Sequence, residues 1–505
     1  MKRAVAWLLV LSIGLVADDC WDDDDCWHDH HCDNFFVVPP PPAGPAADLN
    51  VDGFADVVIG APLHDGGGPP GSQRGAVFVH FGSATGPSAA PSLTIFGQED
   101  GARFGSSIAF VGDVNGRGAP DLLVGAPLDD GDGNTSENGI DRGRAFVFFG
   151  GPAMDATPDV VMTGAEPGAE FGTSVARIAD TNGDGFDDWI VGAPFDDGDG
   201  NATDEGTDRG RAFFFYGGST PDGVPDVTFT GPEAGSQFGF AVDSAGDINH
   251  GGAEDIAVGA PLDDGDGNAT DEGTDRGRVY VFFGGSALDA TPDLILTGDE
   301  NGAHFGASVA VVLDVNNDGV DDLLVGAPLH DAGGGAGANR GRAYVFFGGS
   351  PPDATADVTL SGTVNGGSFG AAVSRAGDAN GDGVWDFLVG APLEDPGART
   401  DAGSAYLFFG GAGVDGIPDL TFTGAEAGAH FGAAVAGPGD INQGGRDLII
   451  GAPLDDADGN ATDDALDRGR TFVFFGGSGG VLDTTPDATI NGPQNGARAG
   501  SAIGN

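Results

Sequence analysis

One short acidic loop contains the residues of this chain best suited to bind a metal ion. Asp180, Asn182, Asp184 and Asp188 occupy positions 1, 3, 5 and 9 of the loop, and Gly185 occupies position 6. In a tight loop, alternate side chains point inward and a glycine permits the sharp turn. Because calcium takes about six to eight oxygen ligands, this spacing predicts a calcium (Ca2+) site.

The same four oxygen ligands recur in register, which makes the signal stronger than one loop alone. The other intact sets are Asp48, Asn50, Asp52 and Asp56; Asp314, Asn316, Asp318 and Asp322; and Asp378, Asn380, Asp382 and Asp386. Three further copies are damaged, because Arg117, Gly251 and Gly444 stand where the third oxygen ligand belongs. We expect four calcium-binding loops and three weak or empty ones. The alternative for each loop is an Asx-rich turn closed by its own hydrogen bonds.

A second acidic loop follows in four of the copies. Its acidic and amide residues at positions 1, 3, 5 and 12 are Asp130, Asp132, Asn134 and Asp141; Asp197, Asp199, Asn201 and Asp208; Asp264, Asp266, Asn268 and Asp275; and Asp456, Asp458, Asn460 and Asp467. This is EF-hand spacing, but position 6 is not glycine and position 12 is the shorter Asp instead of Glu. We hypothesise additional calcium-responsive loops at the opposite end of the repeat, with a solvated acidic loop as the alternative.

These loops belong to a unit that recurs seven times, at intervals of 61 to 67 residues. Each loop leads into an apolar strand that ends in Gly-Ala-Pro. In the third copy, residues 212–216 are apolar throughout, which indicates a strand buried on both faces, and residues 226–230 alternate as an outer strand would. A unit of this length holds about four short strands and cannot bury its faces alone. The pattern predicts an all-β fold, a seven-bladed β-propeller.

The two ends of the repeat array favour a closed ring over a solenoid. The last copy finishes with residues 499–503, which read as an opening strand, whereas the first copy starts directly at its acidic loop. The C-terminal strand would therefore complete the first blade and remove the free edges. A solenoid would need dedicated caps, and we find none in the sequence.

Phe-Gly pairs open most of the copies. They stand at Phe104, Phe171, Phe238, Phe305, Phe369 and Phe431. Together with the acidic loop and Gly-Ala-Pro, they resemble the FG-GAP repeat of integrin alpha-subunit propellers over roughly residues 48–505. The family also includes bacterial surface and secreted proteins. The resemblance implies a seven-bladed propeller with calcium on one face and protein ligands commonly bound at the opposite face.

The net charge of -58, from 78 acidic and 20 basic residues, argues against a DNA or RNA partner, because phosphate would be repelled. Three features could each explain this excess of acidic residues: metal-binding loops, a halophilic surface or an acidic face for a cationic partner. The recurrence of Asp at fixed repeat positions favours the first explanation. The 94 glycines and 31 prolines disfavour long helices.

The N-terminus is typical of an export signal. Lys2 and Arg3 precede an apolar run over residues 4–16 that is too short to span a bilayer, so we predict a signal peptide over 1–17 and no transmembrane segment. Residues 18–47 form an acidic tether and a Pro-rich linker, followed by the propeller over 48–505. The tether could hold zinc or copper, although a solvated spacer is the favoured alternative; its candidate ligands are Cys20, Cys26, Cys32, His28, His30 and His31.

The repeats contain no evident nucleophile with a base, pair of catalytic carboxylates or histidine cluster. His64 and His330 hold equivalent repeat positions, which indicates structural roles. We therefore predict a secreted or surface-attached calcium-binding propeller, not an enzyme, that recognises an extracellular protein or glycan ligand and acts in adhesion. The alternatives are an exported polysaccharide-active hydrolase or lyase and a structural component of the cell envelope.

Overall fold

The structure is a computed structural model that describes residues 47–131, 140–199, 206–265, 273–285, 288–457, 466–476 and 482–504. All of these residues belong to the second of the two units into which the chain divides, Gly44–Asn505. The predicted signal peptide and nearly all of the predicted tether lie outside the described residues. In the described part, no helix is long and apolar enough to cross a membrane.

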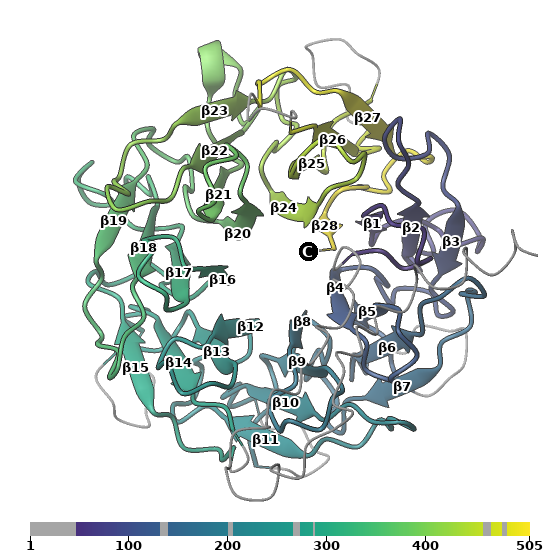
Figure 1. The fold of residues 1–505 in the computed structure, drawn as a ribbon, viewed down its shortest axis with the longest axis horizontal. Helices are drawn as coiled ribbons and strands as arrows, with labels where there is room; N and C mark the ends of the chain where they lie inside the picture. Colours follow the sequence, from purple (N-terminus) through teal and green to yellow (C-terminus); the bar gives the residue numbers. More distant parts are fainter. Residues whose placement is uncertain are drawn as a thin grey trace, which may run out of the picture. The chain divides into compact units, whose positions relative to one another are not determined.

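The second unit is a ring of seven antiparallel four-stranded sheets (Figure 1). We number each sheet as a blade by the acidic loop that it contains, so that blade 1 follows Asp48 and blade 7 follows Asp440. Each blade has an inner, a second, a third and an outer strand. The predicted all-β, seven-bladed β-propeller is confirmed.

The strands occupy equivalent positions in all seven blades. The inner strands are β4 (Ser107–Gly112), β8 (Ser174–Ile178), β12 (Ala241–Gly246), β16 (Ser308–Leu313), β20 (Ala372–Gly377), β24 (Ala434–Gly439) and β28 (Ala502–Ile503). The second strands are β1 (Val57–Ala61), β5 (Asp121–Ala126), β9 (Asp188–Ala193), β13 (Asp255–Ala260), β17 (Asp322–Ala327), β21 (Asp386–Ala391) and β25 (Asp447–Ala452).

The other two strands of each blade lie farther from the axis. The third strands are β2 (Ala76–His80), β6 (Arg144–Phe148), β10 (Arg211–Phe215), β14 (Arg278–Phe282), β18 (Arg342–Phe346), β22 (Ser404–Phe408) and β26 (Arg470–Phe474). The outer strands are β3 (Leu93–Phe96), β7 (Val160–Thr163), β11 (Val227–Thr230), β15 (Leu294–Thr297), β19 (Val358–Ser361), β23 (Leu420–Thr423) and β27 (Ala488–Asn491). One short 3-10 turn, η1 (Pro396–Ala398), lies in blade 6.

Burial follows the sequence pattern of each strand. Every residue of β9 and β10 is buried, as expected for strands covered on both faces by neighbouring blades. In the outer strand β19, buried Leu360 lies between exposed Thr359 and Ser361. The core consists of apolar layers between successive blades, because each sheet can bury its faces only against its neighbours.

The Phe-Gly and Gly-Ala-Pro motifs fit together where two blades meet. A Cβ atom added at Gly125 of the blade 2 Gly-Ala-Pro would lie 2.0 Å from the carbonyl oxygen of Gly172, in the Phe-Gly of blade 3. Phe171 is buried beside Phe213, with ring centroids 5.4 Å apart. Glycine is therefore required for the close backbone approach, and phenylalanine fills the adjacent core.

The chain closes the ring with its C-terminal strand, as predicted. β28 pairs antiparallel with β1, and Ile59 lies opposite Ile503. A side-chain contact supports the closure: the backbone N–H of Asp65 donates to Gln494 Oε1 (3.3 Å), and Gln494 Nε2 donates to Asp65 Oδ2 (2.7 Å). Blade 1 is thus a four-stranded sheet like the others, without an unpaired inner edge.

The inner strands supply one β-branched residue per blade to a belt around the central channel. The aliphatic belt consists of Ile108, Val175, Val242, Val309, Val373, Val435 and Ile503. Six of these side chains are at least 91% buried, so the belt constricts the channel. We call the side carrying the connections between inner and second strands the acidic-loop face. The opposite side, with the hairpins between second and third strands, is the insert face.

Candidate functional site

Each intact acidic loop is a compact turn organised around its first aspartate. In blade 5, Asp314 accepts hydrogen bonds from the backbone N–H groups of Asp318 (2.8 Å) and Gly319 (2.8 Å). Asn316 Oδ1 accepts a second bond from Asp318 N (2.8 Å). Gly319 has a φ of 92°, which favours glycine as the sequence predicts. The residues at positions 1, 3 and 5 therefore surround one turn.

The aspartate at position 9 has a different environment from the other three predicted ligands. Asp322 is fully buried, and its two carboxylate oxygens accept from Val315 N (2.9 Å) and Gly348 N (2.9 Å). Burial raises the pKa of Asp322 to about 7, although both backbone bonds act in the opposite direction. The side chain thus ties the acidic loop to the residues after the third strand.

The same two-point contact is present in every blade, whether its loop is intact or damaged. The equivalent residues are Asp56, Asp121, Asp188, Asp255, Asp386 and Asp447. Position 9 therefore has a structural role that does not depend on the other ligand positions.

The chemistry of positions 1, 3 and 5 fits a hard cation. Each intact loop offers two carboxylates and an amide oxygen, and across the described residues none of these carboxylates forms an ion pair with an arginine, a lysine or a histidine. Position 5 is exposed in all four loops, at Asp52, Asp184, Asp318 and Asp382. Among the described residues, no three acidic, histidine or cysteine side chains are already grouped as a metal site. Bound calcium would be held by these loop oxygens, which now accept backbone hydrogen bonds.

The damaged loops keep the turn without the third ligand. Asp113 still accepts from Arg117 N (2.9 Å) and Gly118 N (2.7 Å), and Asp247 accepts from Gly251 N (2.6 Å). The Arg117 guanidinium lies over the ring of Phe149, 5.0 Å from its centroid. The turn geometry therefore comes from position 1 and the backbone and does not require the position 5 carboxylate that the intact copies add.

The second acidic loops on the insert face are only partly described. Asp132, Asn134, Asn201, Asp266, Asn268, Asp458 and Asn460 lie outside the described residues. At the base of the loop, Asp130 Oδ1 accepts from Ile140 N (2.8 Å) and Asp141 N (3.1 Å), so positions 1 and 12 are joined through the backbone. The same closure is made by Asp197 with Asp208, Asp264 with Asp275, and Asp456 with Asp467.

Two observations indicate that this closure has a structural role. Asp331 of blade 5, whose hairpin lacks the EF-hand spacing, also accepts from Asn339 N (3.2 Å). In blade 2, the aspartate before position 1, Asp129, pairs with Arg144 of the third strand (3.1 Å). The base of the second loop is thus paired with an arginine and contains a turn that blade 5 also has without the insert. Within the described part of the chain, the carboxylates at positions 1 and 5 of the intact acidic loops on the other face have no such arginine.

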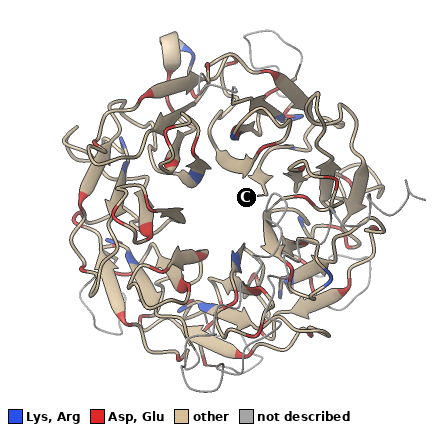
Figure 2. Ribbon diagram, in the orientation of Figure 1, with Lys and Arg blue, Asp and Glu red and all other residues tan. Residues whose placement is uncertain are grey.

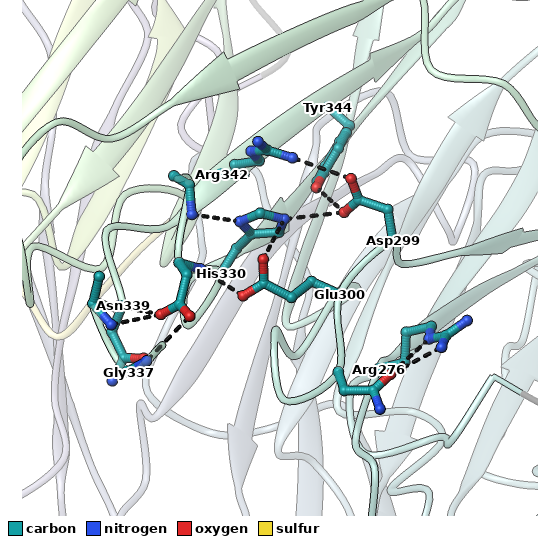
Figure 3. A network of polar contacts seen from close by, with 12 residues as sticks. Arg276, Asp299, Glu300, His330, Gly337, Asn339, Arg342 and Tyr344 are labelled. Carbon is teal, nitrogen blue, oxygen red and sulfur yellow. Dashed lines mark hydrogen bonds and ion pairs between the residues drawn. The ribbon is translucent and has the colours of Figure 1, made fainter. Parts of the chain in front are cut away.

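A polar network joins two connections on the insert face of blade 5 (Figure 3). Buried His330 accepts the Ala332 N–H at Nδ1 (2.7 Å), while its Nε2 faces Asp299 (3.1 Å) and Glu300 (3.3 Å). Tyr344 also donates to Asp299 (2.6 Å). Burial, together with the nearby Arg342 guanidinium, lowers the pKa of His330. In blade 1, His64 Nδ1 accepts the Gly66 N–H (2.9 Å) in the same way, which is consistent with the predicted structural role of both histidines.

Sequence reasoning missed a group of charged residues that face the channel. Arg177, Asp243 and Arg375 lie on inner strands where the equivalent residues of other blades are mostly apolar or small, and they line one cavity with Glu254. Aligning the seven inner strands would have identified them as departures from the repeat. It would not have shown that blades 3, 4 and 6 direct them to the same space.

The repeated unit, the closed ring and the two loop-bearing faces define a seven-bladed β-propeller assembled from one sequence motif. A family model described as "FG-GAP repeat" matches residues 41–80, 305–346 and 369–408, which correspond to blades 1, 5 and 6. These are the three blades without the second acidic insert. The chain thus contains FG-GAP repeats.

Known proteins similar to this chain include an integrin alpha subunit and a phospholipase. Integrin alpha-5 of Xenopus laevis is 33% identical over 232 residues, which cover 44% of this chain and 20% of the integrin. Phosphatidylinositol-glycan-specific phospholipase D of Bos taurus is 28% identical over 408 residues, which cover 74% of this chain and 46% of the phospholipase. The chain thus matches less than half the length of either protein.

A solved structure of a Bacillus licheniformis rhamnogalacturonan lyase aligns with 88% of this chain and 74% of its own, at 12% identity and a TM-score of 0.36. This likeness is too low to support an argument about activity.

Proposed function

We propose that this chain is a secreted or surface-attached calcium-binding propeller that recognises a protein or glycan and acts in adhesion. The observation that carries the proposal is the set of four acidic loops whose position 1 and position 5 carboxylates have no cationic partner. In a protein with a net charge of -58, such pairs repel each other unless a cation joins them. Similarity to integrin alpha-5 supports the recognition role.

Calcium titration by calorimetry on the metal-stripped protein tests the cation sites. We expect saturation at four ions for the acidic loops, and Asp318→Ala should remove one of them. Asp353→Ala, which removes an exposed aspartate from the same blade outside the loop, is the matched control. A protein that binds no calcium contradicts this part of the proposal, whereas more than four ions would support additional binding in the second acidic loops.

Recognition is tested separately with a glycan array and a panel of purified extracellular matrix proteins, in calcium and in EDTA. We expect saturable binding that EDTA abolishes and that falls when the acidic loops are disabled. Calcium binding without any partner in either panel would favour the structural role in the cell envelope. Co-purification of the full chain with envelope material would then support that alternative.

Similarity to the phospholipase supports one enzymatic alternative, since it covers 74% of this chain. Release of a phosphatidylinositol-glycan-anchored protein from membranes, or cleavage of a polysaccharide panel, would favour an enzyme if a point mutation in the propeller abolished it. Without such activity, the recognition role is preferred.

A further inference from the structure

Three charged residues interrupt the repeat on the channel side of the inner strands. Arg177 lies on β8, where β4 and β16 have Phe110 and Val311 at the same position. Asp243 on β12 and Arg375 on β20 are the other two. In the colours of Figure 2, β8 and β20 carry basic segments toward the middle of the ring. The chain has only 20 basic residues, and the repeat pattern does not explain why two of them line one channel.

These side chains line a cavity of about 360 Å³ on the acidic-loop side of the aliphatic belt. Its polar wall is formed by Arg177, Asp243, Ser244, Glu254 and Arg375. The remaining wall is largely the belt itself, whose side chains separate the cavity from the mouth on the insert face. We call this space the channel chamber. It has one polar end and one apolar end, as small-molecule sites commonly have.

The carboxylates of the channel chamber are held by the protein itself. Glu254 accepts from Ser244 Oγ (2.8 Å) in its own blade and from Ala179 N (3.0 Å), a contact that joins blades 3 and 4. Asp243 accepts from Ser244 N (2.9 Å) and Val311 N (3.2 Å). These bonds fix the positions of both acids, so the negative side of the chamber is pre-organised.

The arginines are less completely satisfied. Arg177 pairs with Asp187 through Nη2 (2.8 Å), but its buried Nε has no hydrogen-bond partner. Within the described residues, the guanidinium of Arg375 makes no hydrogen bond or ion pair. Burial lowers the pKa of Arg375; Asp243 opposes this effect, whereas Arg177 adds to it by repulsion. Arg375 is half-buried and lines the cavity, so its guanidinium is available there to an anion.

We propose that the channel chamber binds a small monocarboxylate carrying a hydrogen-bond donor, such as an amino-acid-like zwitterion. The planar fork of Arg375 matches a carboxylate with two parallel hydrogen bonds, and Arg177, which lines the same cavity, adds a second positive charge. Asp243 and Glu254 on the same wall disfavour dianions and attract an ammonium or hydroxyl group. This site uses none of the four intact acidic loops, so it is independent of the proposed recognition function.

Ligand-detected saturation-transfer NMR on the full chain, in EDTA, tests the proposal with acetate, glycine, ethylammonium and sulfate as probes. We expect saturable binding of acetate and glycine, with glycine the tighter of the two, and no saturable binding of ethylammonium or sulfate. Absence of saturable binding by both carboxylates overturns the proposal. Equal binding of ethylammonium and glycine also overturns it, because the ligand would then be selected by the acids alone.

Variants of Arg375 locate the binding. Arg375→Gln should weaken glycine at least about tenfold, because a hydrogen bond to a charged group is lost. Arg399→Gln removes the same charge from an exposed arginine of the same blade and should leave binding unchanged. Equal binding by the two variants refutes the site. If Arg375→Gln does not fold, Arg375→Lys keeps the charge without the fork and should still lower the affinity; unchanged affinity in that variant likewise refutes the proposal.

Discussion

Replacing the buried aspartate of one acidic loop distinguishes a structural role from a metal-binding role. Asp322 lies at position 9 of the blade 5 loop and accepts backbone N–H bonds from Val315 and Gly348. Asp318 lies at position 5 of the same loop and is exposed. Both were predicted as calcium ligands from spacing, but only Asp322 connects the loop to the third strand.

The magnitude follows from the groups left without partners. Asp322→Ala leaves the buried N–H of Val315 and the half-buried N–H of Gly348 unsatisfied, at a cost of about 1–3 kcal/mol for a fully buried group. Removing a carboxylate whose pKa is raised to about 7 by burial relieves part of its desolvation. We therefore expect a net loss of about 2–4 kcal/mol. Asp322→Asn keeps one acceptor oxygen and should lose roughly half as much.

Urea unfolding at pH 8 in EDTA measures this loss, because no calcium is then bound. Asp318→Ala should unfold at the wild-type midpoint in EDTA and should differ only in the stabilisation gained when calcium is added. The reasoning is refuted if Asp322→Ala shows the wild-type midpoint in EDTA and loses only its calcium response. Position 9 would then act chiefly as a ligand.

Three further outcomes test the fold. Nδ1 of His330 accepts a backbone N–H, and the pKa of this residue is lowered below 6.5, so wild-type stability should be complete above pH 6.5 and fall below it. Between pH 7.5 and pH 5, the urea midpoint of His330→Gln should therefore fall less than that of His250→Gln, the control at an exposed site. Gly125→Ala should cost about 1–3 kcal/mol in chemical denaturation, whereas Gly218→Ala, with no atom within 4 Å of the new Cβ, should cost little. Ile503→Asp places a charge in the aliphatic belt beside β1 and should lower stability by at least about 2 kcal/mol; an unchanged melting curve would contradict its role in closure.

The fold could be predicted from sequence because the information is repeated. Each Gly-Ala-Pro strand is apolar, each outer strand alternates, and residues 499–503 resemble an opening strand that the first copy lacks. These local patterns agree with one another, so the number of blades and the closure follow without long-range contacts being known. The structure shifts strand boundaries by one residue, as at β10, which runs from Arg211 to Phe215 instead of over residues 212–216.

The roles of individual loop residues were harder to predict, because one residue type serves two purposes. Asp322 and Asp318 look alike in the sequence, yet one is buried against backbone donors and the other is exposed. The channel chamber was missed for a topological reason. Arg177 and Arg375 are separated by three repeats, and only the curvature of the closed ring directs both toward one cavity.

Ring closure also makes folding depend on the full length of the chain. Until residues 502–503 are available, β1 presents an unpaired edge, and its partner lies almost the entire propeller away in sequence. Contacts between such distant residues form slowly, because a long loop must be closed before they stabilise anything. Six blades can therefore assemble during synthesis while the first remains an open, aggregation-prone sheet. A chaperone that binds exposed strand edges would protect the protein most during this interval, and release would be timed by arrival of the last strand.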